Sequence, residues 1–338
     1  MNVVEALDKV KFYPKKVFSV FPQGDTWVHG NFQPTETPPL KVWAYSAGAA
    51  CGLLFLFLFY CYSGYGPLAT TLEIGKKSLQ AALIENNTVD ASTVSVVILG
   101  SSLLERALVD PAELEAQIVK QTKRKTNVLR VALYSMDMNI AERVGFFKHI
   151  TKYPPQYLFI ENAGVNLKDA FGAGLPIQVD AAVLHLRNKY RTLSGLPLHQ
   201  NYFAKWYTYD TKPSPESDFY NGSFDSVAFK FFQKTEMFVR DVSENETANA
   251  AYKALIGKTK IVFLDMPQSD KLRPHFLNEN EAAKLKKVLE YYKRNYEIDY
   301  WPYPHILPDS YFTEGYHVNS QGAAKYEDWF VSRFAAMR

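Results

Sequence analysis

The chain has 338 residues, 47% of them hydrophobic, and is therefore long enough to bury the core of one large domain. Its 38 basic and 35 acidic residues are mixed along the sequence and give a net charge of +3, which argues against a nucleic-acid-binding surface. The two cysteines, Cys51 and Cys61, lie in one apolar segment, so the sequence contains no cysteine cluster that could hold zinc.

That apolar segment predicts a membrane-spanning helix. Residues 42–72 contain no charged side chain, and residues 42–62 read VWAYSAGAACGLLFLFLFYCY. A helix of this length spans about 30 Å, the thickness of the hydrocarbon core of a bilayer. The segment is longer than the apolar part of a cleaved signal peptide, and a helix that is apolar on all sides is more typical of a membrane than of a core. We therefore predict one transmembrane helix over residues 42–63.

The charges on either side of this segment predict its orientation. Residues 1–41 carry five lysines, whereas Lys76 and Lys77 follow the segment. Because cytoplasmic flanks are enriched in basic residues, the N-terminal tail is expected in the cytoplasm. Residues 67–338 are then expected on the extracytoplasmic side of the membrane.

Beyond residue 67, apolar runs of strand length alternate with segments of helical length. The run VSVVILG (94–100) ends in glycine and is typical of a parallel strand buried on both faces. Asp110 and Pro111 then provide the cap and first position of a helix. The predicted strands are 94–100, 127–134, 156–162, 260–267 and 297–303, and the predicted helices are 110–125, 139–153, 279–296 and one beginning near Ser320.

This alternation predicts an α/β fold, with a doubly wound, flavodoxin-like parallel sheet of about five strands. Ligands of such sheets bind at the carboxyl ends of the strands. Residues 168–258, between the third and fourth strands, form an insert rich in Tyr, Phe and Trp, where we expect substrate selection. These aromatic side chains are typical either of a sugar- or lipid-binding surface or of an ordinary core.

Three loops at the expected carboxyl edge carry polar residues. Ser102 follows the first strand in the sequence GSS, and Asn162 and Asn166 follow the third strand in ENAGVN. His317 enters the last helix in EGYHVNS. Taken singly, these are also typical of a helix cap, a Gly/Asn turn and a solvated loop histidine.

Taken together, the three loops resemble the SGNH (GDSL-type) hydrolase family. In that family a serine follows the first strand, a G-x-N segment follows the third, and a D-x-x-H segment precedes the final helix. The resemblance implies that Ser102 is the nucleophile and His317 the base. It also implies a carboxylate partner for the histidine, for which Glu314 is the first candidate and Asp309 the fallback. It further implies an oxyanion hole, formed by the Ser102 backbone N–H together with Asn166 or, alternatively, Asn162.

Two features depart from the family pattern. The chain has Glu314 where the family usually has aspartate, and residues 130–139, RVALYSMDMN, lack the glycine usual after the second strand. A classical α/β-hydrolase fits less well, because that fold requires G-x-S-x-G and this chain continues from Gly100 as GSSLL.

With its apolar helix, the chain is similar to membrane-anchored SGNH members such as the D-alanyl transfer protein of teichoic acids and the alginate O-acetylation proteins. The resemblance implies serine-dependent acyl-ester transfer or hydrolysis, as an O-acetyltransferase or esterase, on an envelope polysaccharide or related polymer. It implies an acyl-enzyme intermediate without cofactor or metal, and a multi-pass membrane acyltransferase as partner. Ala44, Gly48 and Gly52 offer such a partner a helix-packing face.

Two other functions stay open at this stage. One is a catalytically silent SGNH scaffold that binds polymer or positions the membrane partner. The other is a lipid-directed esterase or thioesterase.

Overall fold

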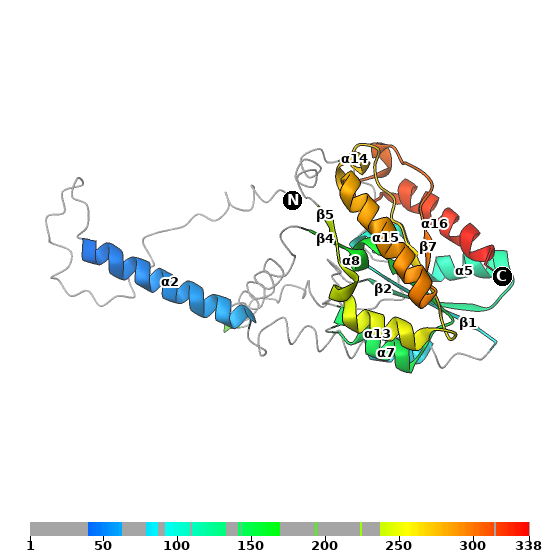
Figure 1. Cartoon of the computed structure of the whole chain (residues 1–338), viewed down its shortest axis with the longest axis horizontal. Helices are drawn as coiled ribbons and strands as arrows, with labels where there is room; N and C mark the ends of the chain where they lie inside the picture. The colour runs from blue at the N-terminus through cyan, green and yellow to red at the C-terminus, as the bar shows by residue number, and fades with distance from the viewer. Residues whose placement is uncertain are drawn as a thin grey trace. The chain divides into compact units, whose positions relative to one another are not determined.

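The computed structural model describes residues 40–62, 79–86, 92–108, 110–132, 141–142, 144–169, 193–194, 224, 237–313 and 316–337 (Figure 1). Glu314 and most of the segment between residues 170 and 236 lie outside these ranges. The aromatic stretches at 201–210 and 218–232 are therefore outside the described residues, apart from Phe224.

The apolar segment forms helix α2, Leu40–Tyr62, drawn in blue in Figure 1. Its window Leu40–Phe59 has a mean hydropathy of 1.9, and none of that window is buried. Large apolar side chains such as Leu53 and Phe55 are exposed. The helix is long and apolar enough to be a membrane anchor or a signal sequence.

The second part of the chain is built on a five-stranded parallel sheet, as predicted. The strand order is β2-β1-β3-β6-β7, which is the doubly wound order in which the chain reverses direction across the sheet between β1 and β3. The strands are β1 (Val94–Gly100), β2 (Thr126–Ala132), β3 (Tyr157–Glu161), β6 (Lys260–Leu264) and β7 (Asp299–Trp301).

Helices cover both faces of this sheet (Figure 1). The two longest, α15 and α16, begin at asparagine caps: Asn278 accepts from the Glu281 N–H, and Asn319 accepts from the Gln321 and Gly322 N–H groups. Residues 79–86 are also helical. The remaining bounds are α4 (Ser102–Ala107), α5 (Pro111–Thr122), α7 (Phe146–Lys152), α8 (Asn162–Asn166), η2 (Val242–Asn245), α13 (Glu246–Leu255), α14 (Arg273–Phe276), α15 (Glu279–Tyr296), η3 (Asp309–Tyr311) and α16 (Ser320–Ala335).

Alternate side chains of each central strand enter two separate cores. Val97 and Leu99 of β1 pack on the face covered by α7, α13 and α15, whereas Val96 and Ile98 pack on the face covered by α4, α5 and α16. Burial on both faces explains why β1 is a continuous apolar run. At roughly 25 cal/mol per Å² of buried apolar surface, these two cores supply most of the stabilisation of the sheet.

A short antiparallel ribbon lies where the insert begins and ends. Strand β4 (Leu167–Asp169) pairs with β5 (Met237–Val239). After this ribbon the chain returns to the main fold, because α13 buries Tyr252 in the core against α7 and α15. The part of segment 168–258 that follows Val239 thus packs with the α/β unit.

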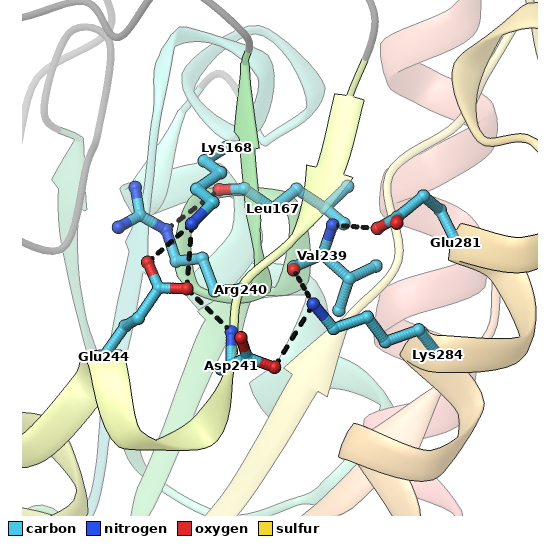
Figure 2. A network of polar contacts seen from close by, with 8 residues as sticks. All are labelled: Leu167, Lys168, Val239, Arg240, Asp241, Glu244, Glu281 and Lys284. Carbon is cyan, nitrogen blue, oxygen red and sulfur yellow. Dashed lines mark hydrogen bonds and ion pairs between the residues drawn. The ribbon is translucent and has the colours of Figure 1, made fainter.

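Polar contacts fix the ribbon to helix α15 (Figure 2). Lys284 donates to the Val239 carbonyl oxygen at 2.8 Å, and the Glu281 carboxylate accepts from the Val239 N–H. These contacts satisfy backbone groups that a two-stranded ribbon leaves unpaired at its edge. On the other strand, Lys168 pairs with Glu244 at 2.7 Å, and this bond lowers the pKa of the Glu244 carboxyl. The base of the insert is therefore held in place from both strands.

Candidate active site

The turn after β1 places two serines at the carboxyl edge of the sheet. Ser101 is the N-cap of α4 and accepts from the Leu103 N–H at 3.1 Å, so Ser102 is the first residue of the helix. Gly100 is needed for this turn: a Cβ atom there would lie against Leu104 and 2.9 Å from Glu161 Oε2. The close approach brings the turn onto the end of β3.

Glu161, the last residue of β3, holds this turn. Its carboxylate accepts from the Ser101 N–H at 2.7 Å and from the Ser101 hydroxyl at 2.8 Å. The side chain is buried, and burial raises the pKa of the carboxyl while the bonds from Ser101 lower it. Sequence reasoning missed Glu161, although a charged residue at the end of the buried run YLFIE is an available signal.

The neighbouring serine meets the histidine loop. The Oγ atom of Ser102 lies 2.9 Å from Nε2 of His317, across 215 positions of the sequence. Both side chains are half-buried. The structure thus places the serine and the histidine within hydrogen-bond distance of each other.

His317 is held by its own backbone. Phe312 and Val318 form an isolated antiparallel bridge that closes a tight loop around it. The N–H and the hydroxyl of Thr313 both donate to the His317 carbonyl oxygen, at 2.9 and 3.2 Å. The loop position is therefore set independently of the imidazole.

Helix α16 also fixes this loop through Gly322. A Cβ atom at Gly322 would lie 2.5 Å from the Tyr311 carbonyl oxygen and 2.8 Å from Val318 Cβ. Only glycine permits this approach of the helix to the loop.

Of the two candidate carboxylates, the structure describes only Asp309. Glu314, the first candidate, lies outside the described residues. Asp309, the fallback, forms an ion pair with Lys271 and thereby raises the pKa of that lysine. Asp309, the first residue of η3, is thus already paired with a lysine.

The two candidate oxyanion donors contact each other. Asn166 Nδ2 donates to Asn162 Oδ1 at 2.9 Å, across the short helix α8 that follows β3. Asn166 is fully buried, and its Oδ1 atom has no hydrogen-bond partner among the described residues. Of the two asparagines, Asn162 is the one that lines a cavity.

This cavity has a volume of about 360 Å³ and lies at the carboxyl ends of β3, β6 and β7. Leu103, which follows the serine, and Tyr316, which precedes the histidine, both line it. Its most unusual lining residue is Asp265, which follows β6 directly and was assigned to the strand by the sequence analysis. Burial raises the pKa of the Asp265 carboxyl to about 6, although hydrogen bonds from the Tyr303 N–H and the Tyr300 side chain lower it.

No group of three or more His, Cys, Asp or Glu residues in the described ranges is arranged to hold a metal ion. Comparison of the chain with protein-family models, with curated proteins and with solved structures finds no match. What the geometry offers chemically is a serine hydroxyl against an imidazole, at the edge of a parallel sheet and beside a partly polar cavity.

Proposed function

We propose that the chain is a membrane-anchored SGNH-type enzyme that transfers or hydrolyses an acyl ester through Ser102. The observation that carries the proposal is the 2.9 Å contact between Ser102 Oγ and His317 Nε2. A serine hydroxyl is a weak nucleophile until a neighbouring base takes its proton, and an imidazole at hydrogen-bond distance is the usual base. The parallel sheet, with both residues at its carboxyl edge, supports the same reading.

In the proposed reaction, Ser102 Oγ attacks the ester carbonyl carbon while His317 Nε2 takes the hydroxyl proton. The tetrahedral intermediate collapses, the acyl–oxygen bond to the leaving alcohol breaks, and the imidazolium returns the proton to that alcohol. A second alcohol or water then attacks the acyl-enzyme in the reverse sense. Transfer and hydrolysis differ only in this second nucleophile.

The oxyanion would be held by the Ser102 backbone N–H and by one asparagine amide, with each donor worth on the order of 3 kcal/mol. Sequence reasoning placed Asn166 first and Asn162 second. The cavity favours the reverse order, because Asn162 lines it and Asn166 lies behind Asn162 with its amide donating to Asn162 Oδ1. Asn166 then orients the Asn162 side chain.

The remaining parts of the proposal concern location and partners. We assign α2 as the anchor, with the α/β unit on the periplasmic or outer side of a bacterial membrane. The substrate would be an envelope polysaccharide or related polymer. A multi-pass membrane acyltransferase would supply the acyl group. These assignments depend on the family resemblance and on the apolar character of α2.

A catalytically silent scaffold is the second candidate. One observation favours it: the fallback carboxylate Asp309 is engaged by Lys271, which leaves Glu314 as the acid on which an active triad depends. The lipid-directed esterase is less well supported, because a fatty acyl chain in the cavity would bury Asp265 against hydrocarbon.

Turnover of p-nitrophenyl acetate by the full chain tests the proposal. Ser102→Ala and His317→Ala should each reduce turnover to background, and the double variant should lose no more than either single variant, because the two residues act as a unit. Glu314→Gln should reduce turnover clearly more than Asp309→Asn. Ser320→Ala, an exposed serine next to the same loop, serves as the control and should keep full activity. Full activity in His317→Ala would leave the scaffold as the better reading.

A further inference from the structure

The cavity beside Ser102 contains a carboxylate that the proposed chemistry does not use. Among the described residues Asp265 has no ion-pair partner, and its carboxylate accepts from the Tyr303 N–H, at 3.3 Å, from the Tyr300 side chain and from the Met266 N–H. A carboxylate offers about four lone-pair sites, so Asp265 keeps capacity to accept a further hydrogen bond.

The other walls of the cavity supply complementary groups. Arg273 of α14 lines the cavity and supplies a guanidinium that can donate hydrogen bonds. Its positive charge lowers the pKa of Asp265 although the two groups are too far apart to form an ion pair. Tyr300, Tyr303 and Tyr316 add aromatic rings, and Leu285 of α15 adds apolar surface. An acceptor, a donor and ring faces in one cavity are what a hydroxylated ring requires: its hydroxyls pair with the polar groups and its C–H face packs on the aromatics.

Size also bears on the occupant. A cavity of about 360 Å³ lies near the lower end of the range for small-ligand sites, about 300 to 1,000 Å³, and suits an occupant of about the size of one sugar ring. A purely apolar occupant would leave the Asp265 carboxylate buried and without its solvent hydrogen bonds, which is unfavourable.

We infer that this cavity is a subsite for one hydroxylated ring of the acyl acceptor or donor, and that Asp265 is its specificity-determining residue, accepting a hydrogen bond from a ring hydroxyl. The assignment to the reacting polymer rests on the proposed function, whereas the binding site itself does not. Asp265 touches the ligand and not the reacting ester, so it selects what binds without performing chemistry.

Direct binding of methyl glycosides tests the inference independently of catalysis. The probes are the methyl glycosides of glucose, galactose and mannose, titrated by ligand-observed NMR against the full chain in a detergent without a sugar headgroup. At least one glycoside should bind saturably at millimolar concentration, and equally well to Ser102→Ala. Binding should weaken as the pH falls through about 6, because protonation of Asp265 removes the negative charge that makes it a strong acceptor.

Matched variants assign the binding to the cavity. Asp265→Asn should weaken binding by about tenfold, the effect of losing a charged hydrogen-bond acceptor, while Asp270→Asn, an exposed aspartate nearby, should leave it unchanged. Ala282→Trp, which fills the cavity from α15, should abolish binding, whereas Ala283→Trp, its neighbour outside the lining, should not. Ala282→Trp also covers the case in which Asp265→Asn fails to fold.

Three outcomes would overturn the inference: no saturable binding of any of the three glycosides, unchanged binding in folded Ala282→Trp, or tighter binding of octanoate than of every glycoside. Glycoside binding without any ester turnover would refute the proposed function and leave the subsite standing. The two proposals therefore fail separately.

Discussion

Ser101 and Ser102 are adjacent in the sequence but have different partners. The Ser101 hydroxyl donates to the Glu161 carboxylate, whereas the Ser102 hydroxyl lies against the His317 imidazole. A hydroxyl already bonded to a buried carboxylate is fixed in orientation, so Ser101 acts as part of the support of the turn. Ser102 is the one whose proton a base can remove.

We predict that Glu161 positions Ser102. Glu161→Leu leaves the Ser101 N–H without its buried acceptor, and should lower the free energy of unfolding by about 1 to 3 kcal/mol. Because the turn carries Ser102, kcat for an acetyl ester should also fall by about tenfold with little change in KM. Glu161→Gln keeps one oxygen for the Ser101 N–H and should recover most of both losses.

Steady-state kinetics and urea unfolding of the same preparations check this prediction. Glu105→Gln on α4 is the control, because that half-buried carboxylate lies outside the Glu161 contacts. A folded Glu161→Leu variant with the kcat of the parent chain would show that the turn holds its shape without the carboxylate.

At the scale of elements, local signals predicted most of the boundaries. The sequence placed helix 279–296 where α15 lies, Glu279–Tyr296, and the last helix near Ser320, and in the structure an asparagine caps each of these starts. The bonds from Ser101 to Glu161 and from Asn166 to Asn162 could not be predicted this way. They depend on the register of β1 against β3 and on the short α8 turn, which no periodic pattern records.

Helix α16 gives a prediction of unusual sign. Gly→Ala within a helix ordinarily stabilises by up to about 1 kcal/mol. At Gly322 the added methyl group would meet the Tyr311 carbonyl oxygen, a backbone atom, and must displace the His317 loop. We therefore expect Gly322→Ala to destabilise by about 1 to 3 kcal/mol and to lower ester turnover.

Thermal unfolding and ester kinetics measure the Gly322 effect. Lys325→Ala, an exposed change on the same helix, is the matched control and should leave both unchanged. A Gly322→Ala chain that is as stable and as active as its parent would mean that the loop tolerates displacement.

The packing of α16 on α5 predicts a pH dependence of stability. Glu327 is buried, and burial raises the pKa of its carboxyl from 4.5 to about 7, aided by the negative charges of Glu113, Asp328 and Asp110. The folded state thus holds a proton that the unfolded state releases, so stability is highest below about 4.5 and declines as the pH rises to about 7. Glu327→Gln should remove this decline, which is on the order of 3 kcal/mol.

Urea unfolding at pH 5 and pH 8 checks the sign. The parent chain should lose more stability between the two pH values than Glu327→Gln, whereas Glu290→Gln, an exposed glutamate of α15 that is not among the charges acting on Glu327, should behave like the parent. An equal pH dependence in the parent and in Glu327→Gln would show that other groups control it.

At the scale of the whole molecule, the sequence pattern predicted the apolar helix and the α/β unit, but not the ribbon at the two ends of the insert. Strands β4 and β5 have three residues each, too few for an alternating pattern to be recognised. Their stability comes from groups far apart in the sequence: Lys168 pairs with Glu244, and the backbone of Val239 bonds with side chains of α15, as Figure 2 shows. Such pairings become visible only once the chain is folded.

The cores of the sheet lead to the last prediction. Among the described residues, both cores draw only on side chains from Leu79 onward, and none of the α2 window Leu40–Phe59 is buried. Deletion of residues 1–66 should therefore give a soluble, folded domain with the ester turnover of the full chain, measured by circular dichroism, sedimentation and kinetics.

The same assignment predicts that a reporter fused after Arg338 is located outside the cytoplasm, since the lysine-rich tail favours the inner side. An aggregated or unfolded truncation would place α2 within the fold instead of in a membrane. A cytoplasmic reporter would reverse the topology while leaving the anchor in place. The two measurements therefore test separate assignments. The solubility of the truncated chain tests whether α2 belongs to the core, and the reporter tests on which side of the membrane the α/β unit lies.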